Sequence, residues 1–170
     1  MSWLSRLFGR SPGTPPEPAP PPAAAPPTAA EIVESVRGVE AQIAGRVPAA
    51  VTARVHGIAR TVEEMAPRLD RFGVGSRQAH TVVATATSYL PEAVGGYLRL
   101  PREWADTRPI DGYKTSLMVL VDQLELLGST MDKILDAANR SDAQALIAHG
   151  RFLQAKFGQT AGPDLTIGPA

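Results

Sequence analysis

The sequence predicts an all-α protein, an antiparallel bundle of four to five helices that follows a disordered, Pro/Ala-rich N-terminal region. Two stretches alternate apolar residues at spacings of four and three, a pattern typical of helices that pack side by side. By contrast, 9 of the 20 residues from 11 to 30 are proline, too many for a helix or a packed core. Almost nothing indicates strands. The two apolar stripes are Val51, Val55, Ile58, Val62, Met65, Leu69 and Phe72, and Tyr113, Leu117, Leu120, Leu124, Leu127, Met131, Ile134 and Ala138.

Four consecutive units follow from these patterns. Residues 1–10 form a short amphipathic segment that would act as an anchor, and residues 11–30 form a disordered linker. Residues 31–158 form the helical bundle, and residues 159–170 form a flexible tail. The third unit is long enough to bury one core of four or five helices.

The first helix is predicted to begin at Thr28, because Glu31 stands three residues later, the spacing of a capping box. Pro48 suits the first turn of the second helix. Pro67 is expected to kink or end that helix near Met65, and a kink is favoured because the apolar stripe continues to Phe72. The inward-facing residues predicted for the first helix are Ile32, Val36, Val39 and Ile43.

A third helix is expected from Arg77, with Ser76 as its N-cap, and Pro91 is expected to interrupt it. An irregular link between two further prolines would then cover Trp104. Asp111 is expected to cap the long fourth helix, over residues 112–139. A separate fifth helix would start at Ser141 and Asp142, with the apolar stripe Ala143, Leu146, Gly150, Leu153 and Phe157.

Composition excludes several classes of protein. Lys plus Arg and Asp plus Glu number 17 each, so no net charge attracts nucleic acid. The absence of cysteine excludes a disulfide framework, thiol catalysis and a cysteine-ligated zinc site. No apolar run reaches the roughly 18 residues of a membrane span, and residues 1–10 lack the apolar core of a secretory signal. We therefore expect a cytoplasmic location, or a peripheral one on the inner face of the cell membrane.

No motif in the sequence predicts a catalytic, cofactor or metal site. The histidines lack the Glu-x-x-His spacing of a di-iron bundle, and no phosphate-binding or nucleophile motif is present. Asp122 with Glu125, and Asp132 with Asp136, lie one helical turn apart and could share a cation. They are interpreted more simply as the solvated face of a long helix. The sequence leaves enzymatic activity open but favours a protein that is not an enzyme and holds no cofactor.

The N-terminal segment is the clearest candidate for binding. At 100° per residue, its four large apolar side chains fall within an arc of roughly 140°, and its two arginines lie outside that arc. Such a surface could dock on an anionic membrane, or in a groove of the bundle or of a partner protein, and the sequence does not decide between these. The residues concerned are Trp3, Leu4, Leu7 and Phe8, with Arg6 and Arg10.

One segment resembles a known family. The segment from Tyr89 to Pro101 carries a Tyr-Leu-Pro and a Tyr-Leu-x-Leu-Pro pattern and is followed by a long Leu-rich helix. Over residues 80–157 the chain resembles bacterial helical proteins of the XpaC-like group, associated with toxic-anion resistance and, by name, with indolyl phosphate hydrolysis. This resemblance implies a helical fold but brings no catalytic residue set to this chain.

Together these observations predict a non-enzymatic helical scaffold or accessory protein of a bacterial envelope-stress or toxic-anion response. Its partner would be a protein or an anionic membrane surface, not nucleic acid, and it could form a homo-oligomer. One alternative is a metal-dependent phosphoesterase-like enzyme. Another is an encapsulated cargo protein, because residues 164–168 are similar to the tail peptides that load cargo into encapsulin shells.

Overall fold

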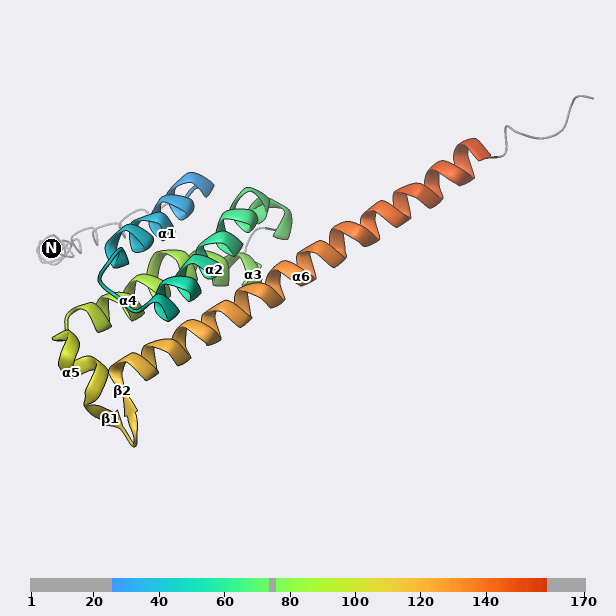
Figure 1. The fold of residues 1–170 in the computed structure, drawn as a ribbon. Helices are drawn as coiled ribbons and strands as arrows, with labels where there is room; N and C mark the ends of the chain where they lie inside the picture. The colour runs from blue at the N-terminus through green and yellow to red at the C-terminus, as the bar shows by residue number, and fades with distance from the viewer. Residues whose placement is uncertain (1–25, 74–75, 159–170) are drawn as a thin grey trace, which may run out of the picture.

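The computed structural model describes residues 26–73 and 76–158 of the chain, and these residues are mostly helical. The predicted class is confirmed at that level, with one small antiparallel hairpin in addition (Figure 1). In chain order the elements are α1 (Ala29–Ile43), α2 (Ala49–Met65), the 3-10 helix η2 (Ala66–Phe72), α3 (Arg77–Ala84), the π-helical segment η3 (Thr85–Tyr89), α4 (Leu90–Leu98), α5 (Arg102–Thr107), β1 (Pro109–Asp111), β2 (Lys114–Thr115) and α6 (Ser116–Phe157).

The predicted capping box begins α1. The Thr28 hydroxyl accepts the backbone N–H of Glu31 at 3.3 Å, and the Thr28 backbone N–H donates to the Glu31 carboxylate at 2.7 Å. The Thr28 hydroxyl also donates to the Glu31 carboxylate, at 2.9 Å. The two bonds that the carboxylate accepts, from the Thr28 backbone N–H and from its hydroxyl, hold the pKa of Glu31 below its usual value because they favour the ionised form. All four residues predicted to face inward from this helix are buried: Ile32, Val36, Val39 and Ile43.

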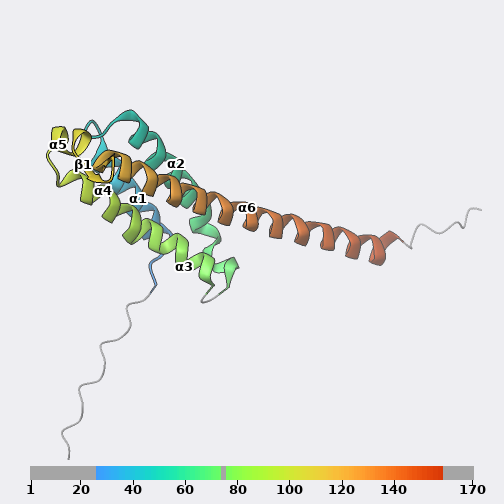
Figure 2. The same ribbon diagram turned by 90° about the horizontal axis from the view of Figure 1, so that it is seen from below.

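Helices α1, α2 and α4 and the first half of α6 pack around one apolar core. We call this part of the protein the head. α2 lies between α1 and α6, and α4 lies between the same two helices on the other side (Figures 1 and 2). The first predicted stripe lines α2 as expected, and the first half of α6 contributes the other wall. The most deeply buried large side chains are Ile32, Ile43, Ile58, Met65, Leu90, Leu120, Leu124 and Met131.

The two interior prolines are accommodated in different ways. The α-helix ends at Met65, and the chain continues through Pro67 as the 3-10 helix η2 to Phe72. The predicted end near Met65 is therefore observed, and the helical course persists past the proline in a tighter form. Pro91 was expected to interrupt the third helix, and that expectation is wrong. The preceding turn widens into η3, where the Leu90 N–H bonds to the Thr85 carbonyl five residues back. The wider turn accommodates the proline ring, so α3, η3 and α4 run on without a break.

The connection before α6 also differs from the prediction. Asp111 belongs to the hairpin, whose turn contains Gly112 at φ +56°, and the helix cap is instead Thr115, which accepts the Met118 N–H at 3.3 Å. The short helix α5 occupies the link that was expected to be irregular. Trp104 lies on it with 43% of its surface exposed, so the expectation of a covered tryptophan is wrong.

The largest correction concerns α6, one continuous helix of 42 residues where two helices were expected. Residues 139–142 contain neither glycine nor proline, so the capping tendency of Ser141 and Asp142 does not stop a helix that is already formed. Arg140 and Asp136 form an ion pair of 2.6 Å, one turn apart, close to the expected break. The fifth-helix stripe therefore extends away from the head (Figure 1).

Leu124 and its neighbour Glu125 provide a direct test of the packed face of α6. Leu124 is 1% exposed, whereas the Glu125 side chain is 70% exposed and pairs with Arg54 at 3.5 Å. Leu124→Ala should lower the free energy of unfolding by about 2–5 kcal/mol because it leaves a cavity. Glu125→Ala should cost less than about 1 kcal/mol because it removes only a surface ion pair. Urea denaturation measures both, and equal losses would show that the buried face is misassigned.

Candidate functional site

The binding residues predicted from the sequence lie outside the described part of the chain. The structure therefore neither places them nor tests their role. They are Trp3, Leu4, Arg6, Leu7, Phe8 and Arg10.

Two of the histidines in the described part form ordinary surface contacts. His56 lies 2.8 Å from the Glu40 carboxylate, and His149 stacks on Phe152. Within residues 26–73 and 76–158, no three His, Asp or Glu side chains gather closely enough to hold a metal ion. In the same ranges, no helix has the length and hydropathy of a membrane span.

Both acidic pairs that were considered for a cation lie on the exposed side of α6. Asp122 forms an ion pair of 2.6 Å with Lys114, and Asp132 accepts a hydrogen bond from Thr61 at 3.4 Å. Glu125 and Asp136 pair with arginines. Each carboxylate is thus engaged with a protein group, in agreement with the interpretation as a solvated face.

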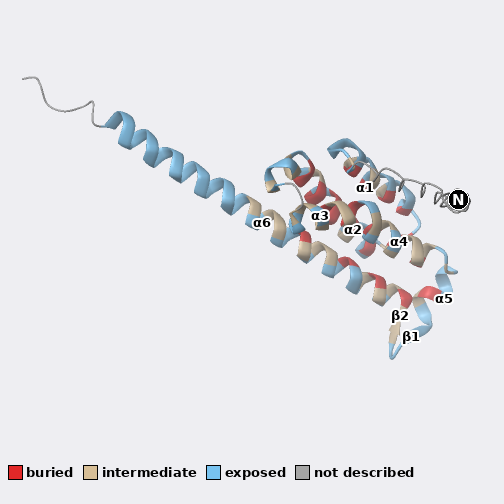
Figure 3. Cartoon of the chain, turned by 180° about the vertical axis from the view of Figure 1, so that it is seen from behind, coloured by how far each residue is buried: buried red, intermediate tan, exposed pale blue. Residues whose placement is uncertain are grey.

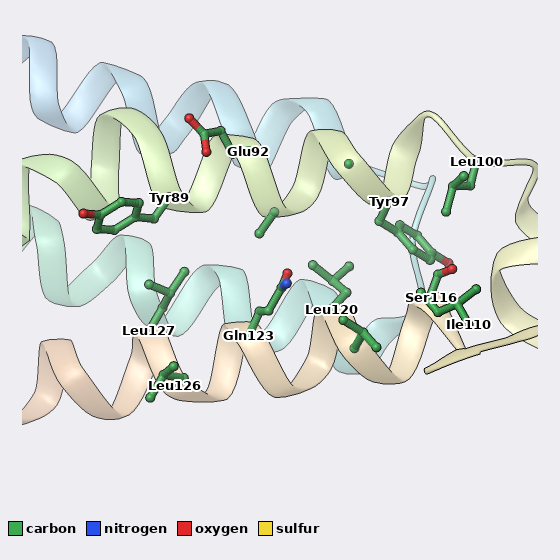
Figure 4. Close-up of a pocket in the computed structure, with 13 residues that line it drawn as sticks. Tyr89, Glu92, Tyr97, Leu100, Ile110, Ser116, Leu120, Gln123, Leu126 and Leu127 are labelled. Atoms are coloured by element: carbon green, nitrogen blue, oxygen red, sulfur yellow. The ribbon is translucent and has the colours of Figure 1, made fainter. Parts of the chain in front are cut away.

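A groove lies between α4 and α6 on the head. Its volume is about 480 Å³, within the range of small-molecule and peptide sites. Each helix contributes residues at spacings of three and four, so one face of each helix forms a wall (Figure 4). In Figure 4, Tyr97 points from α4 toward α6, and Leu120 and Gln123 point from α6 toward α4. The lining is Tyr89, Glu92, Ala93, Gly96, Tyr97 and Leu100, with Ile110, Ser116, Val119, Leu120, Gln123, Leu126 and Leu127.

The groove is open because its α4 wall carries small residues. Ala93 and Gly96 leave space where larger side chains would close the gap. A pair of glycines such as Gly95 and Gly96 can permit a close contact between helices. The contact is absent, because a Cβ added at either position would meet only the Arg99 side chain, at 3.6 and 3.8 Å. Gly96 lines the groove without adding a side chain to it.

Several of the residues that line the groove are polar, among them Glu92, Tyr97 and Gln123. The Tyr97 hydroxyl donates to Asp106 Oδ1 at 2.6 Å, and Asp106 also faces Arg102 at 3.7 Å. Glu92 is exposed and forms no ion pair with any described residue. This arrangement offers apolar contact along the groove and one negative charge at its rim, and it lacks a nucleophile with an adjacent base.

The second candidate surface is the projecting end of α6, residues 143–157, which we call the arm. Between Met131 and Gly158, where the described part of the chain ends, no residue is buried, and every residue of the arm is exposed (Figure 3). The last contacts with the head come from Arg68, which donates to Asn139 Oδ1 at 2.7 Å and faces Asp142 at 4.0 Å. The large apolar side chains of the arm are Leu146, Ile147, Phe152, Leu153 and Phe157.

The arm carries an apolar stripe and a basic charge. Leu146 is 72% exposed, Leu153 39% and Phe157 59%, although all three lie on the stripe that the spacing predicts for helix packing. The charged residues of the arm are Arg151 and Lys156, and Lys156 lies 5.6 Å from the ring centres of two phenylalanines. Contiguous apolar patches on a protein surface commonly mark sites of interaction with another molecule. The apolar stripe of the arm is therefore a candidate binding surface.

The sequence predicted the apolar stripe of the arm, although in a packed helix, and it did not predict the groove. The α6 wall of the groove lies beside the core stripe, at Val119, Gln123 and Leu126, and the glutamine interrupts the apolar spacing there. On α4, the only feature of the sequence that could have indicated the groove is the pair of glycines at 95 and 96.

Comparison with protein-family models, curated proteins and solved structures gives no match. The resemblance to the XpaC-like group accordingly stays a prediction.

Tyr97 predicts a specific pH dependence of stability. Burial and its hydrogen bond to Asp106 raise the pKa of Tyr97 from 10.0 to about 12. The folded protein holds the Tyr97 proton more tightly than the unfolded chain does. The protonated hydroxyl therefore contributes fully to the free energy of unfolding below pH 10, and this contribution is lost as the pH rises toward 12. Urea denaturation across this range should show a steeper loss of stability for the wild type than for Tyr97→Phe. Parallel losses would contradict the assignment; Tyr113→Phe, at an exposed position, controls for removal of a hydroxyl.

Proposed function

We propose that the protein is a non-enzymatic helical scaffold that binds another protein helix along the arm of α6. The observation that carries this proposal is the exposed stripe of Leu146, Leu153 and Phe157 on a helix that extends beyond the head. In this proposal the head is an antiparallel bundle of four helices that holds the base of the arm rigid.

The chemistry of the arm favours a helical protein partner. Its apolar residues alternate at spacings of three and four, which fits knobs-into-holes packing against a second helix. Gly150 lies in the middle of the stripe and leaves room for a large side chain of the partner. The partner is either a second copy of this chain or another protein, and the same surface serves both.

The size of the arm predicts reversible binding. Burying the exposed part of Leu146, Leu153 and Phe157 would contribute roughly 1–2 kcal/mol each, and an equal stripe on the partner would double this gain. The total is comparable to the estimated cost of association, about 4–15 kcal/mol. An accessory protein that assembles and dissociates is therefore a better match than a permanent complex.

The resemblance to the XpaC-like group supports an accessory role in a bacterial envelope-stress or toxic-anion response. The enzyme alternative has less support, because the acids that could bind a metal are engaged by Thr61, Lys114 and arginines. Metal-dependent hydrolysis of a phosphate monoester by purified protein, lost in Asp132→Asn, would favour that alternative instead.

Photo-crosslinking in the cells that make the protein tests the arm directly. A benzoylphenylalanine at position 153 lies on the apolar stripe, and the same probe at position 151 lies on nearly the opposite side of α6. We expect one dominant protein adduct from position 153 and little from position 151. Mass spectrometry of the adduct identifies a second copy or another protein.

A matched pair of substitutions establishes specificity. Leu146→Ser should abolish the adduct from position 153, whereas Gln144→Ser, an exposed polar position two residues away, should leave it unchanged. Both variants should keep the wild-type melting temperature, because neither residue packs on the head. Equal adducts from positions 151 and 153, or an adduct that survives Leu146→Ser, would contradict the proposed surface.

A further inference from the structure

We propose that residues 3–8 of this chain dock as a short amphipathic helix in the groove between α4 and α6 of the same molecule. This inference is independent of the arm, which lies beyond the groove on α6. It assigns an occupant to the groove and a partner to the N-terminal apolar residues.

The shape of the groove fits a helix. Its walls are one face of α4 and one face of α6, and a third helix can place its apolar side chains between them. The head supplies the floor, where Leu120 is 2% exposed and Tyr97 is 6% exposed. Three lining residues are at least half exposed in the described structure and would gain cover from the segment: Tyr89, Ile110 and Leu126.

The chemistry of the two surfaces is complementary. Trp3, Leu4, Leu7 and Phe8 stand at the i, i+1, i+4 and i+5 spacing of one helical face, matching an apolar groove. Arg6 lies outside that face, so it can meet Glu92 at the rim while the apolar side chains enter the groove. Glu92 has no other ionic partner among the described residues.

The linker is long enough for this contact. The Ser35 hydroxyl donates to the Ala86 carbonyl at 2.7 Å, so α1 crosses η3 three residues before Tyr89, where the groove begins. Thr28 lies seven residues before Ser35, about 10 Å along α1, and the groove from Tyr89 to Leu100 is about 17 Å long. Residues 11–27 would span up to about 53 Å as polyproline II. This length exceeds the sum of the distance along α1, the length of the groove and a detour of about 10 Å around α4.

The linker also favours docking within one molecule. A segment tethered at this length samples its own groove at an effective concentration in the millimolar range. That concentration exceeds the concentration of a second copy in dilute solution. A membrane surface offers the apolar residues no shaped site, and its attraction for two arginines is only about 1 kcal/mol each.

Trp3 fluorescence in the full chain tests the proposal. The chain has two tryptophans, so all measurements use a Trp104→Phe background; Trp104 does not line the groove. We expect blue-shifted Trp3 emission and weak quenching by acrylamide, both independent of protein concentration and present without lipid. Gln123→Lys and Leu126→Lys, which place a cation in the groove, should each red-shift the emission and increase quenching several-fold.

Matched controls lie on the same helix outside the groove. Gln144→Lys and Leu146→Lys make the same substitutions at exposed arm positions and should leave Trp3 shielded, even if they abolish partner binding by the arm. Exposed Trp3 in the parent chain overturns the proposal, as does shielding that survives both groove variants. Shielding that grows with protein concentration assigns the groove to a second copy. A blue shift that appears only with anionic phosphatidylglycerol vesicles assigns the segment to membranes. Each of these two results also overturns the intramolecular contact.

Discussion

The architecture depends on the unbroken helical course of α6 through residues 139–142. Leu120, Leu124 and Met131 fix the first half of this helix in the apolar core, so the helix is already nucleated when it leaves the head. Each further residue then needs only to propagate an existing helix, and Arg68 holds the exit point through Asn139 and Asp142. Because no residue in this stretch stops the helix, apolar side chains that would suit a core extend outward as the arm. One helix therefore contributes to the core and, in the proposed function, also binds the partner.

The same helix explains the groove. α6 buries one stripe between α2 and α4, and the neighbouring stripe with Gln123 and Leu126 faces the gap beside α4. That gap stays open because α4 presents Ala93 and Gly96 there rather than large side chains. The π-helical turn before Pro91 lets the helix continue into α4, so Tyr89 of η3 lines the groove together with the residues of α4. The groove and the arm, two surfaces with exposed apolar side chains, thus both involve the single long helix α6.

The sequence predicted the elements that depend on one local pattern, such as a cap or an apolar stripe. It did not predict the elements in which two opposing preferences act on the same residues. The capping box at Thr28 and the stripes of α1 and α2 were confirmed, because each residue contributes to one interaction that the spacing defines. Ser141 and Asp142 resemble a helix start, but their capping preference of about 1 kcal/mol does not outweigh a helix that continues through them. Pro91 has no backbone N–H to donate, but the wider π-helical turn before it accommodates the proline ring, so the helix continues. The groove could not be predicted, since it arises from the space left between two helices rather than from the pattern of either one.

Hydrogen exchange along α6 tests this account most directly. In dilute protein, amides around Leu120, Leu124 and Met131 should exchange as slowly as those of α2, because only global unfolding exposes them. Protection should then decline steadily through residues 139–142 and along the arm, where helical hydrogen bonds open without disturbing the core. The contradicting result would be a fast-exchanging break at residues 139–142 followed by renewed strong protection from Ala143 to Phe157. That pattern would mean a separate fifth helix packed on the head, with neither a continuous α6 nor an exposed arm.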